Sequence, residues 1–201
     1  MSDKRNHSQL LLKSVNKTYK RVLVGNRIPK DYFVTKGKGE SDITIHAGSY
    51  HLALKEAGIE RCNIITYSSI LPAIATEVDK PDPNELVHGS VMETIMATAN
   101  SKKGTRATAG IIYGWLFNKQ TGEKYGGLVC EYNGSDNEEK AGKSLRASLN
   151  ELYTNGFEEN FELKEINLIT ESLIPKKKFG TALVALCFTN YVYPVSEVNV
   201  E

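Results

Sequence analysis

The sequence predicts an α+β domain, in which strands paired as hairpins pack in layers with a few helices. Its 201 residues are 40% hydrophobic and 24% charged, an ordinary globular composition that supports one substantial core. Two segments rich in β-branched, aromatic and glycine residues, 107–117 and 125–132, flank NKQTGEK, which favours a hairpin. Two other segments, 48–58 and 135–156, carry helix signals.

The first part of the chain predicts strand, loop, helix and strand in turn. DYFVTK is typical of a strand at 31–36, and GKGES of a glycine-bearing loop at 37–41. GSYHLALKEAG predicts a helix that ends at Gly58, because glycine favours the left-handed conformation found after a helix C-terminus. CNIITY at 62–67 predicts the next strand, and PDPNE at 81–85 a turn.

The later part predicts one clear helix between strands. The helix begins at Ser135, where SDNE fits a capping box in which Glu138 reaches back to the cap. An apolar stripe follows, and Gly156 ends the helix; the stripe consists of Leu145, Leu149, Leu152 and Tyr153. FELKEINLITESLI and TALVALCFTNYVY predict further strands.

Composition argues against several classes of protein. The longest apolar run, at 182–188, is far shorter than the ~20 residues that span a bilayer, and the N-terminus is too polar for a secretory signal. Cys62, Cys130 and Cys187 lie far apart without a C-x-x-C pair, which argues against a disulfide framework and a cysteine-rich zinc site. We therefore expect a cytoplasmic protein.

Charge is unevenly distributed along the chain. Residues 1–38 contain ten Lys or Arg and two Asp, a net charge of +8, whereas the remainder carries −7. Such a leader can bind nucleic acid or an anionic membrane, or lie against an acidic surface of its own or a neighbouring subunit; we expect packing or solubility rather than either ligand. Helical spacing also predicts an amphipathic helix in part of the leader, through Leu11, Leu12, Val15, Tyr19, Val22 and Leu23.

Two positions carry the candidate chemistry, Ser69 and Glu131. The strand in CNIITYSSILPAIA runs into Ser68 and Ser69, which on their own are typical of a loop whose hydroxyls bond nearby backbone. Glu131 lies among apolar residues in GLVCEYNG, and a buried carboxyl tends to stay protonated and can act as a general acid. An exposed strand face is the alternative for Glu131. His46 and His51, five residues apart, do not share a helical face, so we expect no metal site there.

NIITYSSILP resembles the self-cleavage site of pyruvoyl-dependent arginine decarboxylases, in which a strand bearing Asn runs into Ser-Ser or Thr-Ser, an aliphatic pair and Pro. Further segments resemble the family in order and spacing, with the bacterial branch most similar: GKGES, LALKEAGI, HGSVMETIMA, GTRATAGIIYGW, GLVCEY and KKKFGTALVALCF. The resemblance spans roughly 27–190. It implies a four-layer αββα sandwich, with a single domain at 27–201 after a basic N-terminal extension at 1–26.

The resemblance also implies the chemistry. The Ser69 hydroxyl would attack the carbonyl of Ser68, and elimination followed by loss of ammonia would convert Ser69 into a pyruvoyl group. The chain would thereby divide into a β chain, 1–68, and an α chain, 69–201. Asn63 would polarise the Ser68 carbonyl, and Glu131 would return a proton to the former α-carbon. Neither pyridoxal phosphate nor a metal is required, because the chain makes its own carbonyl.

The implied substrate is a small amino acid, by default arginine, which would yield agmatine and carbon dioxide. His51 departs from the family, which usually carries an aspartate there to hold the guanidinium, and a histidine cannot make that paired contact. Either another acid such as Asp42 substitutes, or the substrate is a different amino acid. Leu54 and Ile70 match apolar positions that line the substrate's methylene chain.

The family's assembly implies a homotrimer of processed units, or a multiple of it, with active sites between subunits and no nucleic-acid or membrane partner. An alternative from another class is a non-enzymatic oligomeric binding protein that retains the fold. The presence of Ser69, Asn63 and Glu131 counts against that alternative.

Overall fold

The computed structural model describes residues 22–197, which fall into two compact units. The smaller unit pairs β1 (Val22–Val24) with β13 (Val195–Glu197) as an antiparallel ribbon. The amphipathic helix expected in the leader lies mostly outside the described residues. At its far end the expectation is wrong, because Val22 and Leu23 belong to the strand β1.

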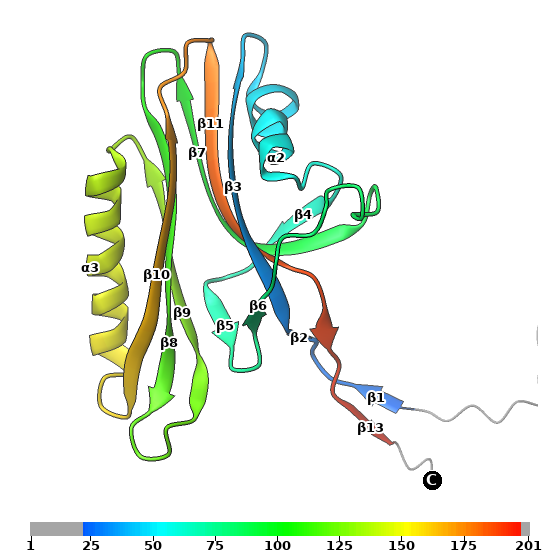
Figure 1. The fold of residues 1–201 in the computed structure, drawn as a ribbon, viewed down its shortest axis with the longest axis vertical. Coiled ribbons are helices and arrows are strands. Elements are labelled where there is room, and N and C mark those ends of the chain that lie inside the picture. The colour runs from blue at the N-terminus through cyan, green and yellow to red at the C-terminus, as the bar shows by residue number, and fades with distance from the viewer. Residues whose placement is uncertain (1–21, 198–201) are drawn as a thin grey trace, which may run out of the picture. The chain divides into compact units, whose positions relative to one another are not determined.

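The larger unit, Ile28–Val192, has a mixed α+β fold that consists mostly of sheet, with two α-helices (Figure 1). A five-stranded sheet has the order β4 (Asn63–Thr66), β7 (Val91–Lys102), β11 (Phe179–Phe188), β3 (Asp31–Ser41) and β6 (Thr76–Glu77). A four-stranded sheet has the order β10 (Phe161–Leu173), β8 (Ala107–Asn118), β9 (Lys124–Gly134) and β5 (Ile70–Pro72). A short ribbon pairs β2 (Ile28–Pro29) with β12 (Tyr191–Val192).

Most of the expected strands are confirmed. β8 and β9 form the expected antiparallel hairpin, and β4, β10 and β11 occupy the segments that their composition indicated. The sequence reasoning missed β7, the 12-residue strand between β4 and β11. Residues 92–95 of β7 are all buried, so the strand lacks the alternation of polar and apolar residues that marks a half-buried strand.

The expected loop at 37–41 is wrong, because these residues continue β3 to Ser41. The glycines serve close packing rather than a turn. A Cβ atom on Gly37 would lie 2.2 Å from the carbonyl oxygen of Ala53, and one on Gly39 would lie 2.3 Å from that of Ser49. The backbone of the following helical segment therefore rests directly on the strand.

That helical segment begins as a π-helical turn, η1 (Ile45–Tyr50), and continues as α2 (His51–Ala57). Gly58 ends α2 in the left-handed conformation, with φ of 73°, as expected from its position. The turn expected at 81–85 is also present, closed by a hydrogen bond from the Glu85 N–H to the Asp82 carbonyl.

The second helix, α3 (Glu138–Gly156), ends at the expected glycine but begins later than expected. Asn137 is its N-cap, since the Asn137 side chain accepts a hydrogen bond from the Lys140 backbone N–H. Ser135 is therefore not the cap, and the expected capping box is wrong. Leu145 and Leu149 are buried as expected, and Leu152 is 40% exposed.

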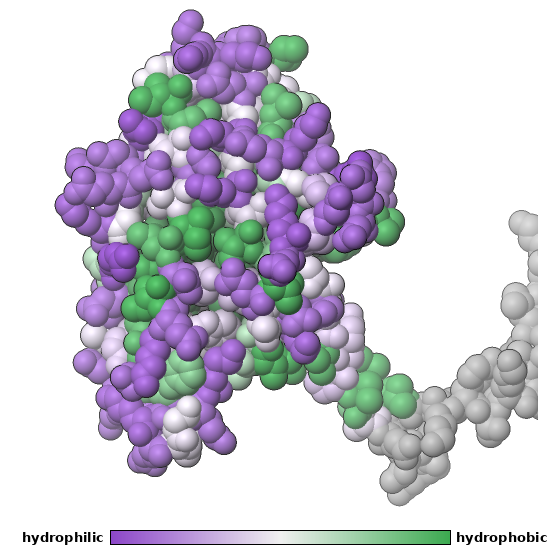
Figure 2. All heavy atoms as spheres, viewed as in Figure 1, coloured by the Kyte–Doolittle hydropathy of each residue, from purple (hydrophilic) through white to green (hydrophobic). Residues whose placement is uncertain are grey.

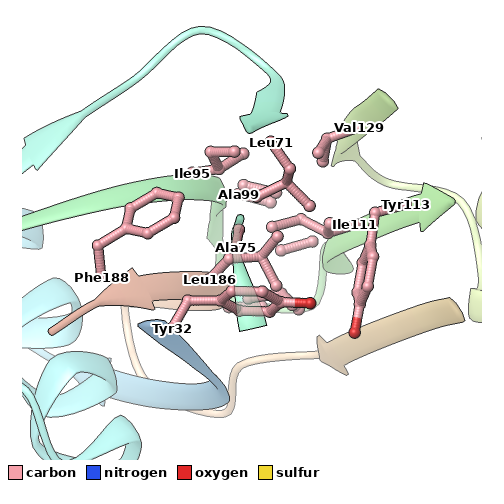
Figure 3. Packing of buried hydrophobic residues seen from close by; sticks show 14 of the residues in the cluster. Tyr32, Leu71, Ala75, Ile95, Ala99, Ile111, Tyr113, Val129, Leu186 and Phe188 are labelled. Carbon is pink, nitrogen blue, oxygen red and sulfur yellow. The ribbon is translucent and has the colours of Figure 1, made fainter. Parts of the chain in front are cut away.

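Three hydrophobic clusters hold the larger unit together. The largest contains residues of both sheets, and Figure 3 shows Leu71 and Val129 of the four-stranded sheet beside Ile95 and Ala99 of the five-stranded sheet. A second cluster joins α2 to the five-stranded sheet, and a third joins α3 to the four-stranded sheet. Each sheet thus buries apolar side chains on both faces.

The surface is mainly hydrophilic, with hydrophobic residues gathered across the middle of the face in Figure 2. Among residues 22–197, no helix is long and apolar enough to cross a membrane.

Candidate active site

The Ser68–Ser69 pair lies where the chain crosses from one sheet to the other. β4 ends in the five-stranded sheet at Thr66, and β5 begins in the four-stranded sheet at Ile70. Backbone hydrogen bonds fix both sides of the crossing: the Tyr67 N–H donates to the Thr94 carbonyl at 2.7 Å, and the Val129 N–H donates to the Ser69 carbonyl at 3.2 Å. The serine pair is therefore a short connection that backbone hydrogen bonds hold on both sides.

The Ser69 hydroxyl contacts a carboxyl that lies 62 positions later in the sequence. Ser69 Oγ donates a hydrogen bond to Glu131 Oε1 at 2.5 Å, and both side chains are half-buried. Glu131 is on β9, opposite Ile111 of β8. A carboxylate that already holds the hydroxyl hydrogen is placed to accept that proton when the oxygen acts as a nucleophile.

The carbonyl of Ser68 is also held in place. It accepts a hydrogen bond from the Ile70 N–H at 2.9 Å, which closes a γ-turn centred on Ser69. Among the described residues only Glu165, besides glycines, has a positive φ, so the turn is of the inverse type. The carbonyl and the hydroxyl of this dipeptide thus have defined partners.

Asn63 lies at the start of β4, and its side-chain amide donates to the Gly89 carbonyl at 2.8 Å. Within residues 22–197 this amide makes no hydrogen bond to the Ser68 carbonyl. One amide hydrogen of Asn63 remains available for another acceptor.

The sequence reasoning did not identify a buried carboxyl that contacts Tyr67, the residue before the serine pair. Glu93 of β7 is 2% exposed, and its Oε2 atom accepts a hydrogen bond from the Tyr67 hydroxyl. A glutamate within the largely apolar segment VMETIMA is a signal that could have indicated it, since carboxyls are rarely buried without a partner.

The three expected substrate-binding residues lie on different elements. Ile70 is 69% exposed and lines an apolar cavity of about 260 Å³ beside Leu71, Tyr125 and Phe157. His51 begins α2 and is exposed, whereas Leu54 is only 7% exposed and belongs to the cluster under that helix. Within one chain, the structure brings Ser68, Ser69, Ile70 and Glu131 together, and no contact joins His51 or Leu54 to them in the described part.

Asp42 already has a partner. Its carboxylate accepts a hydrogen bond from the Lys178 backbone N–H at 3.1 Å. Glu40 is similarly engaged by the backbone N–H groups of Lys176 and Lys177.

No group of three or more His, Cys, Asp or Glu side chains within residues 22–197 could hold a metal ion. The thiol next to Glu131 is not activated either: burial and, secondarily, the Glu131 charge raise the pKa of Cys130 above its ordinary value. The hydroxyl of Ser69, which donates to Glu131, is therefore the candidate nucleophile of this site.

Comparison with known proteins gives a consistent result. A sequence model of the pyruvoyl-dependent arginine decarboxylase family matches residues 31–193. A pyruvoyl-dependent arginine decarboxylase from Methanopyrus kandleri is 30% identical over 158 residues, which cover 79% of this chain and 95% of that protein. The pyruvoyl-dependent arginine decarboxylase AaxB of Chlamydia abortus is 33% identical over 187 residues, covering 83% and 94%. AaxB of Chlamydia trachomatis is 33% identical over 190 residues, with the same coverage.

Proposed function

Because the chain belongs to the pyruvoyl-dependent arginine decarboxylase family, we propose that it cleaves itself between Ser68 and Ser69 and then decarboxylates an amino acid, by default arginine. The observation that carries the proposal is the hydrogen bond from the Ser69 hydroxyl to Glu131. A loop that merely satisfied its hydroxyls would have no need of a half-buried carboxyl from β9. The alternative of a non-enzymatic binding protein gives that contact no purpose.

In the proposed cleavage, Ser69 Oγ bonds to the carbonyl carbon of Ser68 as its proton passes to Glu131. The peptide C–N bond breaks, and the Ser69 nitrogen takes a proton, so the peptide becomes an ester. Loss of the Ser69 α-proton then expels Ser68 as a carboxylate, and one water replaces the nitrogen, which leaves as ammonia. The γ-turn supports the first step, because the Ile70 N–H already polarises the carbonyl under attack.

Asn63 is the proposed second donor to that carbonyl. Its amide donates to Gly89 in this structure, so the proposal requires either its other amide hydrogen or a rotation of the side chain. An aligned donor to a developing oxyanion contributes about 3–4 kcal/mol.

The residues around Ser69 fit a pyruvoyl group. Ser69 supplies the carbon skeleton, its surroundings are half-buried, and Ile70 leads into an apolar cavity. The group supplies an electron-accepting carbonyl to the bound amino acid, so no pyridoxal phosphate or metal is included in the proposal. Glu131 would deliver a proton to the former α-carbon, which makes one carboxyl serve both the cleavage and the turnover.

We also infer a four-layer αββα sandwich that assembles as a trimer or a multiple of it. The three hydrophobic clusters support the layers, since one lies under each helix and one contains both sheets. Exposed apolar side chains on β4, β5 and β7 support a partner surface: Ile70 is 69% exposed, Val91 59% and Ile65 46%. In such an assembly the exposed His51 would approach the Ser69 of a neighbouring subunit, with Leu54 packed beneath it in the cluster under α2. A cytoplasmic setting completes the proposal.

A second candidate keeps the chemistry and changes the amino acid. It is favoured by His51, which offers no carboxylate to a guanidinium, and by Asp42, whose carboxylate is already bonded to backbone.

An assay panel separates the two candidates. The purified protein is incubated with arginine, lysine, ornithine, histidine and aspartate, and carbon dioxide release is measured. We expect arginine to be used, and His51→Asp to lower its KM because a carboxylate can pair with the guanidinium. Lys55→Gln, one turn further along α2, is the control. Turnover of another amino acid alone would select the second candidate, and release from none would reject both.

A further inference from the structure

Tyr67, the residue before the serine pair, is held at three points. Its backbone N–H donates to the Thr94 carbonyl at 2.7 Å. Its ring packs against Phe188 of β11, with the two ring centroids 5.6 Å apart. Its hydroxyl donates to the Oε2 atom of Glu93 on β7. The backbone, the ring and the hydroxyl of Tyr67 are therefore all fixed to the five-stranded sheet.

Glu93 is an unexpected residue at its place in β7. Alternate side chains of a strand share a face, and Ile95, Ala97 and Ala99 on that face are buried in the largest hydrophobic cluster (Figure 3). Glu93 is itself only 2% exposed. A carboxyl buried in such surroundings often costs stability that an apolar side chain of similar size would not. What the carboxyl supplies, and an apolar side chain cannot, is an acceptor for the Tyr67 hydroxyl.

The anchoring of Tyr67 bears on the peptide proposed for cleavage, because only Ser68 separates Tyr67 from Ser69. Ser68 is exposed, so packing of its own side chain does not hold its carbonyl. On one side that carbonyl is fixed by the hydrogen bond from the Ile70 N–H at 2.9 Å. On the other side only the two backbone dihedrals of Ser68 lie between the carbonyl and Tyr67. A shift of Tyr67 would therefore displace the carbonyl directly.

Small displacements matter for the proposed attack. Reacting atoms must approach to about 3–3.5 Å, and a misplacement of about 1 Å can slow a reaction about a hundredfold. The Ser69 hydroxyl is held by Glu131, on the four-stranded sheet. Tyr67, which precedes the carbonyl under attack, is held by Glu93 on the five-stranded sheet. The nucleophile and the carbonyl are thus anchored from different sheets, and each needs its own anchor.

We propose that Glu93 is a positioning residue for self-cleavage, which acts through the Tyr67 hydroxyl to hold the Ser68 carbonyl within reach of Ser69 Oγ. This inference rests on the proposed function and adds a residue to it. The bond changes stay with Ser69 and Glu131, and Glu93 fixes the geometry in which they occur.

The test compares the rate of cleavage with the stability of the same variants. Cleavage is followed on denaturing gels after cell-free synthesis of the full chain. Stability is measured by urea unfolding in a Ser69→Ala background, which lacks the attacking hydroxyl. Tyr67→Phe and Glu93→Met each remove one half of the hydrogen bond, so we expect each to slow cleavage about tenfold or more. Glu93→Gln keeps an oxygen that can accept from the Tyr67 hydroxyl and should retain most of the rate.

The Tyr67→Phe, Glu93→Met double variant separates positioning from stability. It removes both polar groups together, so it should be more stable than Tyr67→Phe, which takes the hydroxyl away from the buried carboxyl. We expect its cleavage to stay as slow as that of the single variants, because the anchor is still missing. The matched control is Tyr153→Phe, since Tyr153 is another half-buried tyrosine, on α3, whose hydroxyl donates to the Phe161 carbonyl at 2.9 Å. It should cleave at the rate of the unaltered protein.

Three results would overturn the inference while the unaltered protein still cleaves itself. The first is cleavage at the full rate in Tyr67→Phe and Glu93→Met. The second is a double variant whose cleavage recovers together with its stability, because Glu93 would then act on the fold alone. The third is a Glu93→Gln variant as slow as Glu93→Met, because the charge rather than the bond to Tyr67 would then matter. An uncut unaltered chain would reject the proposed function together with this inference.

Discussion

Ser69 and Glu131 are 62 positions apart in the sequence, and the fold brings them into hydrogen-bond contact. The resemblance to the family identified both residues but assigned Glu131 only to the protonation after decarboxylation. The structure suggests an earlier role for Glu131 in the proposed function, since its carboxyl accepts the hydrogen bond of the Ser69 hydroxyl. We therefore propose that one residue serves both maturation and turnover.

Glu131→Gln tests this dual role. An amide cannot take up the hydroxyl proton, so we expect cleavage to slow by about a hundredfold or more, the range for removal of a general base. A time course of fragment formation on denaturing gels measures the rate. Glu162→Gln, which alters a carboxyl on β10 that pairs with Lys164, is the control. Cleavage at the rate of the unaltered protein would remove Glu131 from the first step.

For individual residues, the sequence indicates which side chains matter but not which atoms they contact. Sequence could indicate that Ser69 and Glu131 matter, since each stands in a distinctive local segment. It could not indicate that the Asn63 amide bonds to Gly89 or that the Tyr67 hydroxyl bonds to Glu93, because both contacts depend on how strands distant in sequence align.

At the scale of elements, β3 shows that glycines typical of a loop can also lie within a strand. Glycines at 37 and 39 are typical of a loop, yet they lie within an 11-residue strand. Their purpose appears only when the η1–α2 segment is placed against the strand, because the missing side chains make room for its backbone. By contrast Gly58 was predictable, because the left-handed end of a helix is a local property.

Gly39→Ala should destabilise the protein. The added Cβ would lie 2.3 Å from the Ser49 oxygen and 2.7 Å from the Ala53 nitrogen, so η1 and α2 would have to move. We expect the free energy of unfolding to fall by about 1–3 kcal/mol, as overpacked sites do. Denaturant unfolding measures it. Gly156→Ala, where an added Cβ meets nothing within 4 Å, should not destabilise; equal losses in both variants would contradict the packing argument.

The carboxyl of Glu171, which pairs with Lys36 and Lys38 of the other sheet, makes the free energy of unfolding depend on pH. Burial alone would raise the pKa of Glu171, but hydrogen bonds from Lys38 and the Ser172 N–H, with the charges of Lys36 and Lys38, outweigh it and lower that pKa. A carboxyl with a lowered pKa stabilises the fold above the unfolded-state pKa of about 4.3. The contribution is lost as pH falls through the folded-state pKa.

Glu171→Gln should therefore lower the free energy of unfolding at neutral pH, and the difference from the unaltered protein should shrink below about pH 4. Urea unfolding at a series of pH values provides the measurement. If that difference stays constant across the pH series, Glu171 contributes to stability through packing rather than through its charge.

For the whole molecule, the sequence predicted the class of fold and most of its strands, but not their order. Hairpins such as β8–β9 are local and have composition signals, whereas the placement of β7 between β4 and β11 joins segments far apart in the chain. The position of the proposed cleavage site follows from that order. Ser68 and Ser69 bridge the two sheets only because β4 and β5, neighbours in sequence, belong to different sheets.

The most direct test of self-cleavage is the intact mass of the purified protein under denaturing conditions. We expect two chains that end and begin at Ser68 and Ser69, with the larger lighter by one ammonia than a fragment that starts with serine. Ser69→Ala should give a single chain, because no hydroxyl remains to attack. A single uncut chain from the unaltered protein after long incubation, or cleavage of Ser69→Ala at the same bond, would contradict the proposed function.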